Sequence, residues 1–316
     1  NQEMIPGQAV WRVRSKVLQS VRRFFTDRDF LEVETPVRIP TPALETHIDA
    51  LPSGSQFLRT SPELHMKRLL AEGAGRVFQM GPCFRRGEKG RFHNPEFTML
   101  EWYRADAGYL DILVDAKALL GFVAREVLGR TGFEYQGGRV EMMPVWECLT
   151  VEDAFVRWAG WNPVTAFDPD RFDMDLVEKV EPRLPHDRPA VLKDYPAAAA
   201  ALARLKPDNP AVAERWELYV GGLEIANAFS ELTDPAEQRK RFEQCAAQRQ
   251  AAGKEVYPLD EPFLAALEKG IPPCGGAAVG VDRLAMLLTD SSSIEQVRPF
   301  CREESACQRK ASEAVK

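Results

Sequence analysis

The sequence feature that most constrains this fold is a pair of apolar runs separated by a charged loop. The first run, VFQMGPCF, covers residues 77–84, and the second, PEFTMLEWY, covers residues 95–103. The loop between them contains glycine and several charged residues. Apolar runs on either side of a flexible polar loop are typical of an antiparallel hairpin, and a loop of this length usually has a function. We therefore predict a β-hairpin whose loop takes part in binding.

The outgoing strand of this hairpin is predicted to have two different faces, because successive side chains of a β-strand point in opposite directions. One face carries Phe97, Met99, Glu101 and Tyr103, and the other carries Thr98, Leu100 and Trp102. A carboxylate and a phenol beside aromatic and thioether groups can hold an organic cation. Arg85 at the start of the loop, with His93 and Asn94 at its end, can hold a nucleotide. The alternative is an edge hairpin with solvated charges.

A second constraint lies near the end of the sequence, in GGAAVGVDRLAMLL at residues 275–288. The small residues predict a strand that runs into a helix, with Arg283 in the first turn and leucines at helical spacing. The free N–H groups at a helix start favour an anion, and an arginine adds a charged fork for phosphate oxygens. Small side chains also let a ligand approach the backbone. This stretch therefore predicts a phosphate-binding site.

Another hairpin is predicted from WELYV, Gly221 with Gly222, and LEIANAF, since Gly-Gly is a strong signal for a two-residue turn. In the expected register Glu217 faces Ala226. Glu217 and Glu224 then lie on one face as diagonal neighbours, roughly 7–8 Å apart at the backbone. A Mg²⁺ ion between them would relieve their repulsion and could bridge ATP phosphates, whereas the alternative is a solvent-exposed pair. Glu231 reaches this face only through a bulge or at the end of the strand.

Composition narrows the class of protein. The chain has 316 residues, of which 45% are hydrophobic, and this permits one large domain over residues 1–316. No apolar run approaches the roughly 20 residues of a membrane helix, and no signal peptide is recognised, so we expect a cytoplasmic protein. The six cysteines form no CxxC pair, which predicts reduced thiols. The net charge of −6 disfavours RNA as the main partner.

Periodicity and capping predict the remaining elements. In chain order they are a helix over 8–28, a strand over 30–37, a helix begun by Ser61 and Pro62 with Glu63 in its first turn, a helix over 108–130, and a helix capped by Thr150 and Asp153. Residues 160–212 carry no motif and are predicted to be an insertion, in which residues 193–205 form a short strand and then a helix. The last 25 residues are expected to form a polar end.

Together, the first hairpin and the strand-to-helix stretch resemble motifs 2 and 3 of the class II aminoacyl-tRNA synthetases. Within that class, the nearest resemblance is to lysyl-tRNA synthetases, over residues 61–64, 66–68, 93–98, 224–227 and 230–232. The run HNPEFTMLEWYR and the absence of an extra domain are similar to the short paralogues that attach (R)-β-lysine to elongation factor P. The resemblance implies an α+β fold with an antiparallel sheet flanked by helices, and no anticodon-binding domain. The first helix with the 30–37 strand resembles motif 1, which implies a homodimer.

The resemblance also implies a role for each candidate residue. The reaction would be ATP-dependent activation of (R)-β-lysine or lysine as an adenylate, followed by transfer to a lysine of elongation factor P. Arg85 and Arg283 would be catalytic, and Glu217 and Glu224 would hold Mg²⁺. The implied ATP-binding residues are Arg85, Arg86, Gly87, Glu88, His93, Asn94, Phe97, Glu224, Ile225, Gly280 and Arg283. The implied amino-acid-binding residues are Ser61, Pro62, Glu63, Glu101, Tyr103, Asn227, Glu231 and Ala278.

Two positions depart from the family pattern. Gly87 stands where the class usually has a glutamate two residues after the motif 2 arginine, and Glu88 is the candidate replacement. Ala278 stands where lysyl-tRNA synthetases have the middle glycine of motif 3, and its methyl group predicts a preference for β-lysine. Two other functions stay open. One is a free-standing core that charges tRNA, which the lack of room for an anticodon-binding barrel disfavours. The other is a catalytically silent paralogue, which the complete set of ATP-site arginines and glutamates argues against.

Overall fold

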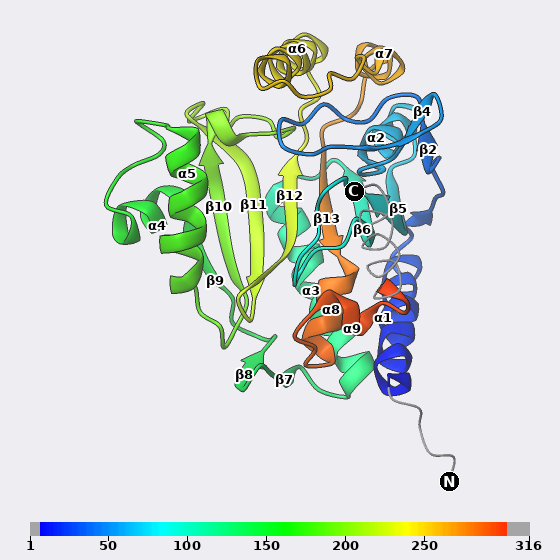
Figure 1. Ribbon diagram of the computed structural model, residues 1–316, viewed down its shortest axis with the longest axis vertical. Coiled ribbons are helices and arrows are strands. Elements are labelled where there is room, and N and C mark those ends of the chain that lie inside the picture. The colour runs from blue at the N-terminus through cyan, green and yellow to red at the C-terminus, as the bar shows by residue number, and fades with distance from the viewer. Residues whose placement is uncertain (1–6, 302–316) are drawn as a thin grey trace, which may run out of the picture.

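The computed structural model describes residues 7–301 (Figure 1). Within that range the main sheet has eight strands in the order β1-β5-β6-β13-β12-β11-β10-β9. Their bounds are β1 Leu31–Glu32, β5 Arg76–Phe84, β6 Glu96–Ala105, β9 Glu147–Thr150, β10 Ala190–Pro196, β11 Val212–Val220, β12 Leu223–Ser230 and β13 Cys274–Gly280. The ladders from β5 to β10 are antiparallel, but β1 and β9 pair in parallel with β5 and β10. The predicted α+β class is confirmed, with the correction that both edges of the sheet are parallel because helical crossovers connect those pairs.

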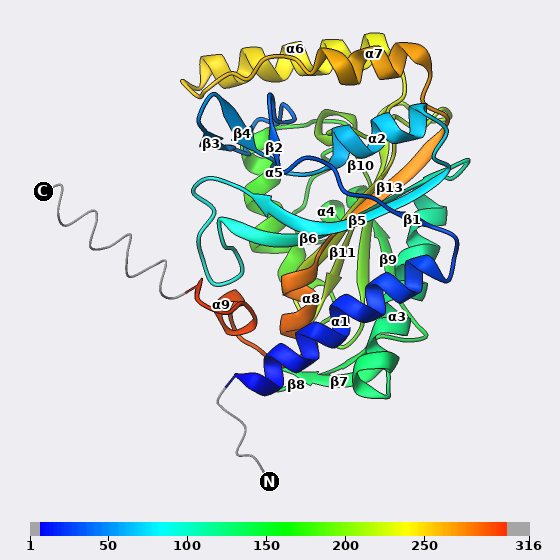
Figure 2. The same ribbon diagram turned by 90° about the vertical axis from the view of Figure 1, so that its right-hand side faces the viewer.

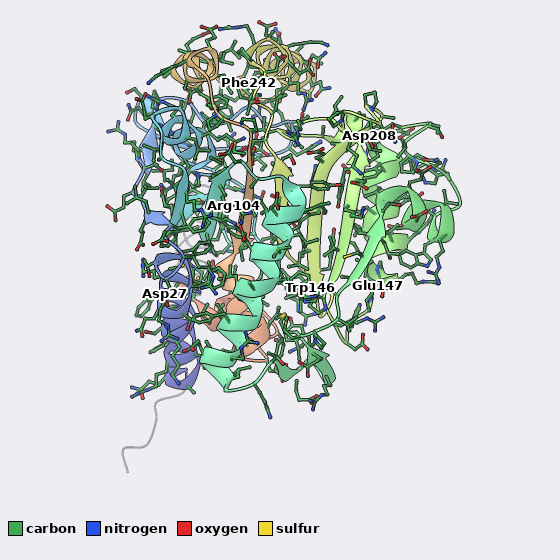
Figure 3. The ribbon with its side chains drawn as sticks, turned by 180° about the vertical axis from the view of Figure 1, so that it is seen from behind. Asp27, Arg104, Trp146, Glu147, Asp208 and Phe242 are labelled. Atoms are coloured by element: carbon green, nitrogen blue, oxygen red, sulfur yellow. The ribbon has the colours of Figure 1, made fainter. Side chains whose placement is uncertain are left out.

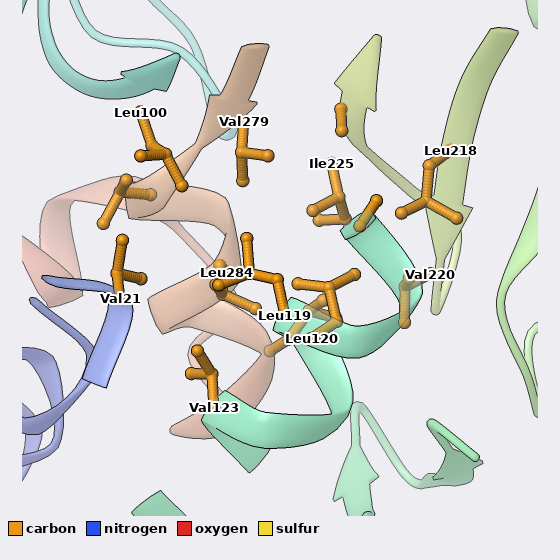
Figure 4. Packing of buried hydrophobic residues seen from close by; sticks show 14 of the residues in the cluster. Val21, Leu100, Leu119, Leu120, Val123, Leu218, Val220, Ile225, Val279 and Leu284 are labelled. Atoms are coloured by element: carbon orange, nitrogen blue, oxygen red, sulfur yellow. The ribbon is translucent and has the colours of Figure 1, made fainter. Parts of the chain in front are cut away.

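One face of the sheet is covered by the helices α1 (Gln8–Thr26), α3 (Tyr109–Leu128) and α8 (Val281–Leu288) (Figures 1 and 3). Figure 4 shows this core at close range, with sheet side chains facing helix side chains. Leu100, Leu218 and Val279 of the sheet, and Leu119 and Leu120 of α3, are each at most 2% exposed. Burying a leucine or valine side chain contributes roughly 1.5–3 kcal/mol. Because the helices cover this face of the sheet, a ligand-binding site has to lie on the opposite face.

Further helices lie at the end of the sheet that is remote from α8 (Figure 2). They are α2 (Glu63–Ala71), α6 (Pro235–Ala251) and α7 (Glu261–Lys269). A second buried cluster joins them to the hairpin, and it contains Leu70 of α2, Phe242 of α6, Phe263 of α7 and Tyr103 of β6. This cluster places the start of α2 beside the outgoing hairpin strand.

Most of the predicted elements outside the two hairpins are confirmed. The helices α1 and α3 match the predictions over 8–28 and 108–130, and α4 (Val151–Trp158) begins at Thr150, whose hydroxyl accepts a hydrogen bond from the Asp153 backbone N–H at 3.0 Å. Helix α2 starts at Glu63, one residue later than predicted, because the Ser61 hydroxyl accepts the Glu63 N–H at 2.9 Å. The predicted strand over 30–37 is wrong beyond Glu32, since the Thr35 backbone binds the side chains of Gln79 and Arg59 instead of a ladder.

The segment 160–212 contains α5 (Pro169–Asp175) and β10, and β10 is an interior strand between β9 and β11. At least residues 190–196 therefore belong to the main sheet, and the extent of any insertion stays a prediction. The predicted helix within 193–205 is absent from this described segment. Only the short 3₁₀ turn Ala197–Ala199 follows Pro196, and Ala201 then adopts a left-handed backbone with φ 49°.

The remaining elements are short. They are the sheet of β2 (Arg38–Ile39), β3 (Leu51–Ser53) and β4 (Gln56–Leu58), the hairpin of β7 (Gly132–Tyr135) and β8 (Gly138–Glu141), the turns Leu176–Val180 and Glu181–Arg183, and α9 (Ile294–Val297). The helix α9 lies within the predicted polar end, and the rest of that end, from residue 302 and including Cys307, lies outside the described residues. The five described cysteines are free. In the described part of the chain no helix is long and apolar enough to cross a membrane.

Candidate active site

The predicted first hairpin is present, with β5 and β6 joined by a loop. The Arg85 N–H donates to the Pro95 carbonyl at 2.9 Å and so continues the pairing into the loop. Leu100 and Trp102 enter the main core, which confirms the predicted alternation of faces. On the opposite face, the Tyr103 hydroxyl donates to Glu101 Oε2 at 2.7 Å.

The second hairpin, β11 with β12, contains a bulge that corrects the predicted register. Glu217 pairs with Asn227 and not with Ala226, because the register shifts by one residue and leaves Ile225 as the extra residue. A bulge turns every following side chain to the opposite face. Asn227 and Glu231 therefore come to the side that also carries Glu217, and the bulge required for Glu231 is confirmed.

The corrected register aligns the candidate residues in one row across neighbouring strands. The paired positions, in strand order from β11 to β6, are Glu217, Asn227, Ala278 and Glu101. On this face β13 presents Gly276, Ala278 and Gly280. A methyl group added at Gly276 would collide with the ring of Tyr103. The strand β13 therefore forms a low floor over which a ligand and the neighbouring side chains can lie.

A pocket opens on this face between the hairpin loop and the start of α8. The predicted site residues that line it are Arg85, Glu88, His93, Asn94, Phe97, Glu224, Ile225, Asn227, Ala278, Gly280 and Arg283. The predicted site residues outside its lining are Ser61, Pro62, Glu63, Arg86, Gly87, Glu101, Tyr103, Glu217 and Glu231. Of these, Arg86 and Gly87 are exposed on the loop, where Gly87 adopts the left-handed conformation with φ 82°.

Arg283 fastens the start of α8 to both hairpins. Its Nη1 donates to the Glu224 carbonyl at 2.7 Å, its Nη2 lies 2.7 Å from His93 Nε2, and its Nε donates to the Phe92 carbonyl at 3.3 Å. The guanidinium also lies 3.3 Å from the Glu224 carboxylate. Arg283 is therefore a rigidly held cation at the pocket wall, and its removal would also loosen the hairpin loop.

Arg85, at the start of the hairpin loop, also lines the pocket and is less completely bonded than Arg283. Its guanidinium lies over the ring of Phe97, 5.1 Å from the ring centroid, and its Nη1 is 3.8 Å from Glu88. The buried Nε of Arg85 has no hydrogen-bond partner among the described residues. Buried donors are seldom left unpaired in folded proteins, so this N–H fits a ligand with anionic oxygens.

A cluster of buried acids lies beside the pocket, towards α2. Glu101 accepts one hydrogen bond from Ser61 at 2.6 Å and another from Tyr103 at 2.7 Å. Lys67 forms ion pairs with Glu63 and Glu231, the latter at 2.5 Å. Burial raises the pKa of Glu101 to about 7 and that of Glu231 to about 8. Ionising a buried carboxylate without a nearby positive charge costs free energy, so a cation that binds beside these carboxylates is favoured.

Comparison with known proteins decides the family. Residues 6–304 match the family described as tRNA synthetases class II (D, K and N). The chain belongs to this family. A lysine–tRNA ligase from Moorella thermoacetica is 41% identical, over 92% of this chain and 64% of that ligase. Elongation factor P–(R)-β-lysine ligases from Hamiltonella defensa and Proteus mirabilis are 38% and 39% identical, over 91% of this chain and 93% of each relative.

These matches confirm the predicted resemblance to class II synthetases and to the elongation factor P ligases. They also show that the chain spans less than two thirds of the length of the lysine–tRNA ligase, but nearly all of each elongation factor P ligase. The three relatives named above are all ligases by name, so the chain belongs to a family that contains ligases.

Glu217 and Glu224, the carboxylates predicted to hold Mg²⁺, differ in their bonds to neighbouring side chains and in their exposure in this class II synthetase. Glu217 is bound by Arg215 at 2.5 Å and by the Tyr219 hydroxyl at 2.7 Å. Burial alone would raise the pKa of Glu217, but Arg215 and the hydroxyls around it hold that pKa below its usual value. Glu224 is 41% exposed in its side chain, and burial of the site with the nearby Glu217 charge raises its pKa.

No group of three or more metal-ligating side chains occurs among residues 7–301. Mg²⁺ is typically bound through one or two carboxylates together with substrate phosphates, so Glu224 and Glu217 fit that ion chemically. Their assignment as a metal site stays a prediction.

The structure also brings in residues that the sequence analysis missed. Lys67 follows Glu63 by four residues on α2, a spacing that favours an ion pair on a helix. Asp282 is 2% exposed, accepts the Thr98 N–H at 2.7 Å and pairs with Arg14 at 2.5 Å. The position of Asp282 in the first turn of a helix is the sequence signal that could have identified it. Glu181 lies 3.2 Å from the Tyr219 hydroxyl and comes from a segment without any motif.

Proposed function

We propose that this synthetase activates (R)-β-lysine or lysine with ATP and transfers the acyl group to a lysine side chain of elongation factor P. The observation that carries the proposal is the row Glu217–Asn227–Ala278–Glu101, which joins an arginine-walled pocket to a buried acidic cluster on one face of the sheet. The pocket suits the phosphates of ATP, and the cluster suits the ammonium groups of a lysine-like substrate.

In the first step, a carboxylate oxygen of the amino acid attacks the α-phosphorus of ATP. A new P–O bond forms, the bond from the α-phosphorus to the bridging oxygen of the β-phosphate breaks, and pyrophosphate leaves. Arg85 and Arg283, which both line the pocket, bind phosphate oxygens and stabilise the charge that develops there. Mg²⁺, held by Glu224 and Glu217, would neutralise phosphate charge when bound. Because no side chain acts as a nucleophile, catalysis consists of positioning and electrostatics.

The amino acid is held at the acidic end of the row. Glu101 and Tyr103 bind the distal ammonium, and Glu63 and Glu231 are the further ligands of the amino groups. Asn227 and Ala278 line the pocket and lie in the same row as Glu101, where the reacting carboxylate has to meet ATP. Substrate positioning of this kind converts a reaction between two molecules into an effectively unimolecular one.

In the second step, the acceptor amine attacks the acyl carbonyl carbon of the adenylate. An amide N–C bond forms, the acyl–phosphate C–O bond breaks, AMP leaves, and the amine loses a proton to solvent. Elongation factor P is supported as the acceptor because relatives named for that substrate are matched over 93% of their length. Arg86, Lys89 and Arg91 are exposed on the hairpin loop at the pocket and can steer an acidic partner.

We also propose a homodimer through α1 and residues 30–37, in the cytoplasm, where ATP is supplied. Leu31 on the edge strand β1 is 59% exposed, and Trp11 of α1 is 41% exposed. An edge strand that shows a large apolar side chain is usually covered in the functional protein.

The test of the acceptor uses the enzyme, ATP and labelled lysine or (R)-β-lysine with either elongation factor P or tRNA. We expect label on elongation factor P and little on tRNA. The 41% identity to a lysine–tRNA ligase favours tRNA as the second candidate acceptor. Efficient labelling of tRNA with none on the protein would overturn the proposal in favour of that candidate.

A further inference from the structure

Lys67 is a buried charged residue of the site that has no role in the proposed reaction so far. Its side chain is 1% exposed, and its ammonium lies between the carboxylates of Glu63 and Glu231. The same ammonium is 6.0 Å from the centre of the Tyr103 ring. It therefore occupies the middle of the acidic cluster without contacting the ATP pocket, whose lining does not include it.

One cation faces three carboxylates in this cluster. Burial lowers the pKa of a lysine, but the paired Glu231 and Glu63 raise the pKa of Lys67 well above its usual value, so it stays charged. When the carboxylates of Glu63, Glu101 and Glu231 are all ionised, the single ammonium of Lys67 leaves two of their negative charges uncompensated. Lysine and β-lysine each carry two ammonium groups, so the remaining charge matches this class of substrate.

We propose that Lys67 is a positioning residue: its ammonium holds the Glu63 and Glu231 carboxylates in place and favours the charged form of Glu231, so that the cluster accepts a diammonium amino acid near neutral pH. The inference rests on the proposed function, because it assigns the cluster to a lysine-like substrate. Without Lys67, the mutual repulsion of the carboxylates would be relieved by binding a proton, and that proton would compete with the substrate.

The groups that face this cluster come from every element around it. They are Glu63 of α2, Cys83 of β5, Glu101 and Tyr103 of β6, Cys274 of β13, Glu231 after β12, and Glu45 and Arg204 from the flanking loops. Since burial raises the pKa of Glu101 to about 7 and of Glu231 to about 8, the parent protein should bind its ammonium substrate more tightly as pH rises through 7 to 8. Removing the Lys67 charge would move this rise to higher pH.

The experiment is ATP–pyrophosphate exchange with lysine and (R)-β-lysine, measured between pH 6.5 and 9 for the parent protein and Lys67→Met. We expect KM for the amino acid to rise at least about tenfold at pH 7.5, the equivalent of one pKa unit, and to recover as pH increases. KM for ATP should stay within about twofold of the parent. Lys269→Met is the matched control, because the Lys269 ion pair with Glu72 is exposed and Glu72 lies at the opposite end of α2 from Glu63.

The outcomes separate the possible roles. A parent-like pH profile in Lys67→Met would overturn the inference, and so would an equal loss at every pH with a raised KM for ATP, which indicates a purely structural role. If Lys67→Met does not fold, Lys67→Gln carries the same test, because its amide keeps donors for the carboxylates without the charge. A parent protein that exchanges with no lysine isomer would contradict the proposed function itself.

Discussion

Replacing Gly276 with alanine tests how the floor of the site positions the amino-acid-binding cluster. Gly276 pairs with Tyr103 of β6 on one side and with Phe229 of β12 on the other. A methyl group at this position would lie 2.7 Å from Glu231 Oε1 and closer still to the ring of Tyr103. Carbon atoms pack best at about 3.5–4.0 Å, so the ring would have to move by roughly 1 Å or more.

The size of the expected effect depends on how tightly the ring of Tyr103 is packed. Tyr103 is 3% exposed, and its hydroxyl binds Glu101 at 2.7 Å. Forcing an extra methyl group into a well-packed interior typically costs about 1–3 kcal/mol. We therefore expect Gly276→Ala to lower the free energy of unfolding by that amount. Because Tyr103 and Glu101 move together, KM for lysine or β-lysine should also rise about tenfold or more, with KM for ATP little changed.

Denaturant unfolding and pyrophosphate exchange measure these two effects. Gly280→Ala is the control for stability, since a methyl group there would lie 3.8 Å from the nearest atom, Cδ of Arg283, which is an ordinary contact. Its free energy of unfolding should stay within about 0.5 kcal/mol of the parent. Equal stability of Gly276→Ala and Gly280→Ala, with an unchanged KM for the amino acid in the former, would refute the reasoning.

Three further results are expected. Arg283→Ala should lower the rate of pyrophosphate exchange by roughly 10²–10³-fold, because a preorganised charge is lost. It should also make the loop that contains Phe92 and His93 more sensitive to proteolysis. An unchanged exchange rate in the folded variant would contradict the assignment of Arg283. Ala278→Gly should narrow the preference for β-lysine over lysine, which a single methyl group can set at about 10–200-fold, and an unchanged ratio would show that Ala278 is not the selector. Sedimentation should show a dimer at micromolar protein that Leu31→Glu weakens, whereas a parent monomer would contradict the interface.

The sequence predicted the hairpins, the motif 3 strand and helix, and the faces of the outgoing strand, because apolar alternation and glycine turns are local signals. The alternation of Leu100 and Trp102 with Glu101 and Tyr103 is one such case. The parity of Glu231 pointed to a bulge, but its position at Ile225 and the register that follows from it were missed. The position of a bulge depends on how three neighbouring strands share hydrogen bonds, and no residue type in LEIANAF indicates where it lies.

The ion pairs made by the glutamates of the site were also not predicted. Arg215 occupies one oxygen of Glu217, and Lys67 sits between Glu63 and Glu231. The sequence analysis assigned no role to either basic residue, because the distant Glu231 that completes the Lys67 pairing reaches it only through the fold. The strand β10 was placed in an insertion because no motif marks it, although its partners β9 and β11 are the strands before and after it in the chain.

The central claim is that the acidic cluster selects a lysine-like amino acid for activation by ATP. The most direct measurement is pyrophosphate exchange by the parent protein with (R)-β-lysine, lysine, aspartate and asparagine as separate substrates, since the family as a whole covers D, K and N. Buried Glu101 and Glu231 should repel the side-chain carboxylate of aspartate and should have no ammonium group to bind in asparagine. We predict exchange with (R)-β-lysine or lysine and none above background with the other two. Exchange driven by aspartate or asparagine, with none driven by either lysine isomer, would contradict the account.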